Sequence, residues 1–142
     1  VGGKTDIIMM LNGALAGLVS ITAGPLDPSP MAAILIGAVG GLIMYLGTHL
    51  LNRLKLDDVV GAIPVHMFAG IWGTLIVPFS SPDASYLTQF IGVVSVISFV
   101  FVLSFIVFLI IKNTIGLRIS EEAEQLGTDK AEVGVLAYSI RD

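Results

Sequence analysis

One segment decides the fold of this chain: DDVVGAIPVHMFAGIWG, residues 57–73. It opens a long apolar run, and from Val59 to Phe79 the only ionisable residue is His66. A run of about 20 apolar residues has the length of a membrane-crossing helix. An ionisable group inside such a helix is expensive to bury, so by default it marks a path for ions, protons or substrate. A neutral histidine that is hydrogen-bonded to a neighbouring helix fits the residue type equally well, and at this point both interpretations stay open.

The composition supports an integral membrane protein. Hydrophobic residues make up 55% of the chain and charged residues 13%, and the mean hydropathy is +0.94. Soluble domains carry about 25% charged residues. The chain has no cysteine, which excludes disulfides, thiolate metal sites and cysteine nucleophiles. The net charge of -4 belongs largely to a polar tail that runs from Glu121 to Asp142, and there is no basic stripe for nucleic acid.

Four apolar runs have about the length that crosses a hydrocarbon core. They cover residues 7–23, 31–51, 59–79 and 86–111. The fourth run is rich in Val, Ile and Phe, but it is far longer than a strand of about 4 to 8 residues. The sequence therefore predicts an all-α integral membrane protein with about four transmembrane helices in residues 1–115. A short cytoplasmic tail over residues 116–142 follows them.

The basic residues predict how the chain is oriented. All seven Lys and Arg residues lie before the first apolar run, between the second and third, or after the fourth. The other two connections, residues 24–30 and 80–85, contain none. Short cytoplasmic loops collect Lys and Arg. We therefore expect a multi-pass protein of the cell membrane with both ends of this chain in the cytoplasm.

Small residues recur at helical spacing in the first three runs. In lipid, Gly or Ala at every fourth position lets helix backbones approach closely. In the third run, ideal α-helical spacing would also place the imidazole on the small-residue face. These strips are Gly13 and Gly17; Ala33, Gly37 and Gly41; and Ala62, His66, Ala69, Gly70 and Gly73. We expect neighbouring helices to pack along them.

Three further residues, one in the first run and two at the start of the third, have predicted local roles. Asn12, in the first run, is expected to hydrogen-bond across helices rather than to meet substrate. Asp58 precedes the third run as an N-cap would, and this role is favoured over contact with a transported species. Pro64 cannot donate to the Val60 carbonyl, so it either kinks the helix or lies in its first turn, and the sequence leaves both open.

The tail shows signals for short helices. Ser120 and the Glu residues after it should begin a helix that Gly127 ends, and Asp129 and Glu132 have the spacing of a capping box. Apolar anchors recur at Leu126, Leu136 and Tyr138. The tail is therefore predicted to dock on the protein's own cytoplasmic face or on a soluble partner, with a disordered tail as the alternative.

Taken together, these segments resemble the C-terminal part of ammonium transporters of the Amt/Mep/Rh family. The matching pieces are residues 12–23, 56–73, and 116–122 with 137–138. They come in the family's order, with the right number of spans between them. The resemblance covers essentially the whole chain, but only about the last four of the family's eleven spans. It implies ammonium or ammonia as substrate, a bilayer location, and a homotrimer in the full-length parent. It implies no enzymatic activity, cofactor or metal.

The resemblance also implies roles for individual residues. His66 would be the second of two paired pore histidines, and this chain would supply that one alone. Ala62, one turn earlier, would line the inner part of the pore, and Asn12 would face it from a neighbouring helix. The residues expected near the pore in a structural role are Asp58, Gly70 and Gly73.

In family members the tail closes over the cytoplasmic pore mouth and contacts PII-type signalling proteins. The residues expected to take part here are Gly116, Arg118, Glu121 and Tyr138. The family pattern commonly has a His before its second tail Gly, whereas this chain has Val133 before Gly134. Regulation through that position is therefore not expected.

Two alternatives belong to other functional classes. The first is an ammonium-sensing membrane module that signals through its tail. The second is a polytopic membrane enzyme. His66 has no second histidine or carboxylate within one or two turns on its own helix, so the sequence offers neither a metal site nor an acid–base pair there.

Overall fold

The structure is a computed structural model that describes residues 4–137, and every regular element in that range is helical. The long helices are α1 (Ile7–Ile21), α2 (Pro30–Leu54) and α4 (Tyr86–Thr114). The third apolar run forms η1 (Ile63–Phe68), α3 (Ala69–Ile76) and η2 (Val77–Phe79), which follow one another without a break. The tail forms α5 (Glu121–Leu126) and η3 (Asp129–Val133). The chain divides into two compact units, and the boundary follows Val96, within α4.

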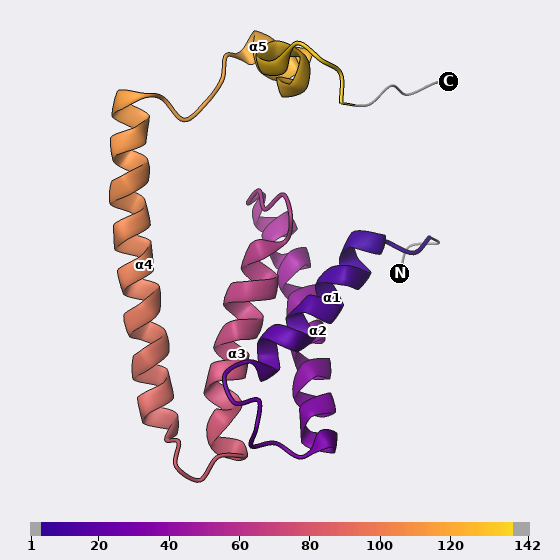
Figure 1. Ribbon diagram of the computed structural model, residues 1–142, viewed down its shortest axis with the longest axis vertical. Helices are drawn as coiled ribbons and strands as arrows, with labels where there is room; N and C mark the ends of the chain where they lie inside the picture. The colour runs from indigo at the N-terminus through magenta and orange to yellow at the C-terminus, as the bar shows by residue number, and fades with distance from the viewer. Residues whose placement is uncertain (1–3, 138–142) are drawn as a thin grey trace. The chain divides into compact units, whose positions relative to one another are not determined.

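Local chemistry sets the ends of the first two helices. The Asp6 side chain accepts a hydrogen bond from the Met9 amide and so caps α1. Ser29 caps α2 in the same way, and Pro30 follows as its first residue, where its missing N–H costs nothing. At the other end of α2, Lys55 takes a left-handed conformation with φ 56°. Within the first unit, α1, α2 and α3 pack against one another (Figure 1).

Three of the about four predicted membrane-crossing helices have the required length, and the first stays a prediction. Within residues 4–137, three segments have the required length and apolarity: Pro30–Leu54, Ile63–Ser80 and Tyr86–Thr114. The α1 helix has 15 residues and is about 22 Å long, short of a core of about 30 Å. It ends at Ile21, and the turn before Pro25, a residue that cannot continue a helix, follows.

The predicted small-residue strips of the first two runs form the contact between α1 and α2. A Cβ atom added at Gly17 would lie 3.5 Å from the carbonyl oxygen of Gly37, and one added at Gly41 would lie 3.5 Å from that of Gly13. Beside this contact, a small buried cluster joins the helices; its members are Ala16, Met44, Val65 and Ala69. The first unit is therefore held together by close backbone approach, as lipid requires.

The third strip is buried over only part of its length. Ala69 and Gly73 are buried, whereas Ala62 and His66 are exposed on the surface of the first unit. His66 lies in η1, which is a π-helix, so each turn there holds more residues than an α-helical turn. The shared face of the strip stays a prediction.

The α4 helix agrees with the fourth predicted run but extends to Thr114. It contains no buried residue, and large apolar side chains are exposed along its whole length. A helix that is apolar all round suits a lipid or protein-interior environment.

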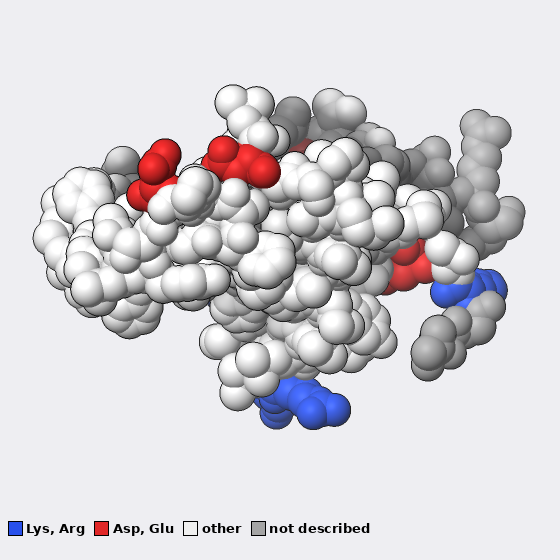
Figure 2. All heavy atoms as spheres, turned by 90° about the horizontal axis from the view of Figure 1, so that it is seen from below, with Lys and Arg blue, Asp and Glu red and all other residues white. Residues whose placement is uncertain are grey.

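The ends of the first unit differ in charge. The N-terminus of α1 lies at one end, together with the last turn of α2, which carries Arg53, and the loop from Lys55 to η1. The loop between α1 and α2 lies at the other end (Figure 1). The loops at this second end contain Asp27 and Asp83 but no basic residue. Figure 2, which views the molecule from the lower side of Figure 1, shows largely uncharged atoms with both acidic and basic atoms among them.

Candidate functional site

The candidate site is the start of η1, which carries His66. Asp58 lies four residues before Ala62, and its carboxylate accepts hydrogen bonds from the amides of Ala62 and Ile63, each at 2.8 Å. Asp58 thus satisfies the first amides of the segment, as predicted, although Ala62 occupies the N-cap position of η1. Pro64 is the second residue of η1 and lies in its first turn, which resolves the alternative that the sequence left open.

Asn12 reaches this turn from α1. Its side-chain Nδ2 donates to the Val60 carbonyl oxygen at 3.0 Å, a contact between residues 48 positions apart. The predicted hydrogen bond across elements is therefore present. Such bonds contribute roughly 0.6 to 2 kcal/mol in membrane proteins. The acceptor, Val60, lies in the loop that leads into η1 rather than in a helix.

His66 is exposed on the first unit, and none of the side-chain hydrogen bonds within residues 4–137 involves its ring. Ala62, one turn earlier, is exposed as well. Both side chains therefore lie on the surface of the first unit, where α1 and α2 do not cover them. Among the described residues, no group of three or more His, Asp or Glu side chains could hold a metal ion.

The two glycines predicted to lie near His66 contact α1. A Cβ atom added at Gly70 would lie 3.7 Å from the side chain of Val19, which is ordinary van der Waals contact. One added at Gly73 would lie 2.5 Å from the Ser20 carbonyl oxygen. Gly73 is therefore needed for the packing of α3 on α1.

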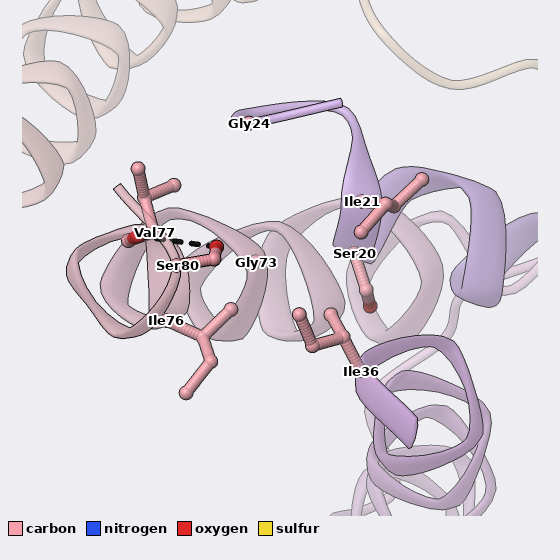
Figure 3. A pocket seen from close by; sticks show the side chains of 8 residues that line it. All are labelled: Ser20, Ile21, Gly24, Ile36, Gly73, Ile76, Val77 and Ser80. Atoms are coloured by element: carbon pink, nitrogen blue, oxygen red, sulfur yellow. Dashed lines mark hydrogen bonds between the residues drawn. The ribbon is translucent and has the colours of Figure 1, made fainter. Parts of the chain in front are cut away.

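Ser20 joins the three helices of the first unit. Its buried hydroxyl lies 2.7 Å from the Ala16 carbonyl oxygen and 3.4 Å from that of Ala69, and Gly40 of α2 packs directly on it. Beside it lies a hollow of about 10 Å³, lined by residues of all three helices (Figure 3). This space suits at most about one water molecule, so the hollow is not a substrate site.

Sequence reasoning missed two of these features. Trp72 donates its indole N–H to the Ile36 carbonyl oxygen at 3.1 Å and so ties α3 to α2. The π turn around His66 was also not foreseen. The available signal was Pro64, whose missing N–H disturbs the regular helical pattern.

The tail residues lie in short helices. Gly116, with φ 93°, follows the end of α4, and Glu121 is the first residue of α5. Arg118 forms an exposed ion pair with Glu124, with an N–O distance of 2.8 Å. Ser120 caps α5 and Gly127 ends it, as predicted. Tyr138 lies outside the described residues.

The predicted capping box at Asp129 is wrong. The Asp129 carboxylate instead accepts hydrogen bonds from the amides of Ala137, at 2.8 Å, and Lys130, at 2.9 Å. These bonds, the Ala137 bond foremost, lower the pKa of Asp129 because they favour its charged form. The carboxylate therefore closes a turn around Gly134, which has φ 75°.

These features define an all-helical membrane protein with a single histidine on the apolar segment η1–α3. The sequence matches the Ammonium Transporter Family over residues 1–138, and the chain belongs to that family. The predicted resemblance is thereby confirmed.

Curated relatives agree with this assignment. The chain is 38% identical to "Ammonium transporter Amt2" of Archaeoglobus fulgidus, over 96% of this chain and 33% of the relative. It is 39% identical to "Putative ammonium transporter sll1017" of Synechocystis, over 92% of this chain and 30% of the relative. "Ammonium transporter Amt1" of Haloferax mediterranei is 37% identical, over 96% of this chain and 27% of the relative. The chain thus spans about a third or less of the length of these relatives.

Proposed function

We propose that this chain forms part of a protein that conducts ammonium or ammonia across the cell membrane, and that His66 lines the path. The observation that carries the proposal is the position of His66, exposed on the apolar η1–α3 segment of a chain whose relatives are named ammonium transporters. π turns occur frequently at functional sites, which adds support.

The chemistry follows from desolvation. Moving an unpaired ammonium ion into a medium of low dielectric costs tens of kcal/mol by a Born estimate, whereas neutral ammonia loses only hydrogen bonds. An apolar path can therefore pass ammonia at a low cost. The neutral imidazole donates at one nitrogen and accepts at the other, so it can replace hydrogen bonds that ammonia loses on leaving water. In this proposal a cation loses its proton near the entrance, ammonia passes His66, and the proton returns or travels separately through the ring.

Further parts of the proposal concern the neighbours of His66. A second histidine pairs with His66, and Ala62 lines the inner part of the path. The active protein is a homotrimer with both ends of this chain in the cytoplasm, in keeping with the placement of its basic residues. Its tail from Gly116 to Tyr138 contacts a PII-type signalling protein.

The test compares the two histidines of this chain. His66→Ala is made in the protein encoded by the complete reading frame that contains the chain, and methylammonium uptake and current are measured. We expect uptake to change by about tenfold or more, since a barrier change of about 1.4 kcal/mol suffices for that factor. Selectivity against other monovalent cations should change with it.

His49→Ala is the matched control. His49 is exposed near the end of α2, and its ring contacts the Tyr45 carbonyl oxygen at 2.9 Å within the same helix. This variant should transport like the unaltered protein. Unchanged rate and selectivity in His66→Ala would remove His66 from the mechanism.

A further inference from the structure

We infer that Gly47 of α2 is a positioning residue for His66: the missing side chain at Gly47 forms a notch that seats η1, and the depth of this notch sets how far the imidazole reaches into the path. The inference rests on the proposed function, because it concerns the path that His66 lines. Its structural part stands on the contacts between α2 and η1.

The notch lies on the buried face of α2. Gly47 is buried, and Met44 and Leu51, about one turn to either side of it, are buried as well. A glycine between larger side chains lets a neighbouring helix approach closely. At this position the neighbour is η1.

Two residues of η1 occupy the place that a side chain at position 47 would need. A Cβ atom added at Gly47 would lie 2.5 Å and 2.9 Å from two ring carbons of Phe68, and 3.2 Å from the Cβ atom of Pro64. Ordinary contacts between carbon atoms are about 3.5–4.0 Å long. A residue larger than glycine at position 47 must therefore displace the Phe68 ring, the whole of η1, or both.

His66 lies on the opposite side of η1. It follows Pro64 by two residues and precedes Phe68 by two, and two residues make about half a turn of a helix. The burial agrees with this spacing, because Pro64 is buried and Phe68 half-buried while His66 is exposed. A movement of η1 away from α2 would thus carry His66 in the direction in which its side chain projects.

This arrangement links the size of residue 47 to the width of the path. A Cβ atom at position 47 reaches ordinary contact with Phe68 only after a movement of about 1 Å. When η1 makes this movement as one body, His66 advances by a similar distance and narrows the path. A narrower path excludes methylammonium, which carries an additional methyl group, more strongly than ammonium. Gly47 therefore sets the size of the substrate that passes His66.

The test is a double-mutant cycle in the protein from the complete reading frame, reconstituted in liposomes. The variants are Gly47→Ala, Phe68→Val, which removes the two ring carbons nearest to position 47, and the double variant. Gly41→Ala is the matched control, because it adds the same methyl group to the same helix at an ordinary contact distance, 3.5 Å from the Gly13 carbonyl oxygen. The readouts are the ratio of methylammonium to ammonium current, the thermal unfolding midpoint, and the amount of protein in the membrane.

Gly47→Ala should lower the ratio of methylammonium to ammonium current by about threefold to tenfold, since a misplacement of about 1 Å can change a rate by up to about 100-fold. Adding Phe68→Val should return the ratio toward that of Phe68→Val alone, because η1 can then settle back onto α2. Gly41→Ala should leave the ratio unchanged. If Gly47→Ala fails to accumulate, recovery of the protein by Phe68→Val supports the inference.

An unchanged ratio in Gly47→Ala would overturn the inference, whether or not both currents fall together, because η1 would then not have narrowed the path. A lowered ratio or a loss of accumulation that Phe68→Val does not rescue would also overturn it, since the contact with Phe68 would not be the cause. If His66→Ala itself transports normally, the proposed function fails, and the consequence for transport fails with it. The unfolding midpoints still decide the structural part: a non-additive cycle shows that Gly47 and Phe68 are coupled, and an additive one shows that they are not.

Discussion

Ser20 and the glycines around it are the tightest contact among single residues of the first unit. The carbonyl oxygen of Ser20 faces Gly73, and its hydroxyl faces Gly40. Backbone atoms cannot move aside as a flexible side chain can. The absence of a side chain at these glycines is therefore a packing requirement and not a matter of chain flexibility.

Gly73→Ala should consequently destabilise the protein. The added methyl would lie 2.5 Å from the Ser20 carbonyl oxygen, and overpacking of this kind typically costs about 1–3 kcal/mol. The matched control is Gly92→Ala in α4, where an added Cβ would meet no other atom within 4 Å among the described residues. Thermal unfolding of the reconstituted protein should show a lowered midpoint for Gly73→Ala only. Equal midpoints for the two variants would refute the packing argument.

Helix ends in this chain follow local rules. Ser29 and Ser120 were recognisable as caps, and Gly127 as a stop, because capping depends on residues within one turn. The capping box at Asp129 failed because Ala137, eight residues further on, offers the carboxylate a different donor. Local rules thus predict helix ends well where no more distant group competes.

The turn that follows η3 should depend on pH. Its hydrogen bonds lower the pKa of Asp129 in the folded tail, so the charged carboxylate stabilises the turn. This contribution is complete above the ordinary pKa of an aspartate and is lost as the pH falls through the lowered value. The amide proton shift of Ala137, followed by NMR in the reconstituted protein, should therefore stay constant from neutral pH down to that range and then change. Asp129→Asn should abolish the titration, and a shift that titrates unchanged in this variant would contradict the assignment.

At the scale of the whole molecule, few apolar side chains within residues 4–137 are buried. They lie in α1, α2 and the η1–η2 segment: Ala16, Ile36, Met44, Leu51, Val65, Ala69 and Val77. The α4 helix adds none. In lipid or detergent, helices associate through packing rather than through the hydrophobic effect. Helices that bury so little have little to hold them together.

Residues 1–142 expressed alone should therefore unfold over a broad temperature range in detergent. The protein from the complete reading frame is the control. If its other segments cover the exposed faces of these helices, it should unfold more sharply and at a higher temperature. Circular dichroism at increasing temperature measures the width and the midpoint of the transition, and size-exclusion chromatography checks that the protein stays dispersed. A sharp, single transition of the isolated chain would show that these helices need no further partner.

Apolar run lengths, caps and the distribution of Lys and Arg were enough to predict a helical membrane protein, the positions of three long spans and the segment around His66. The spans follow from the transfer of apolar side chains from water to lipid, and the helix ends follow from hydrogen bonds within one turn. Residues that are close in the sequence therefore determine both. The tertiary structure decided that Asn12 bonds to Val60 and that His66 lies exposed on a π turn while Ala69 and Gly73 are buried. Those outcomes depend on groups up to 48 positions apart, whose approach is set by how α1 packs on η1 and α3.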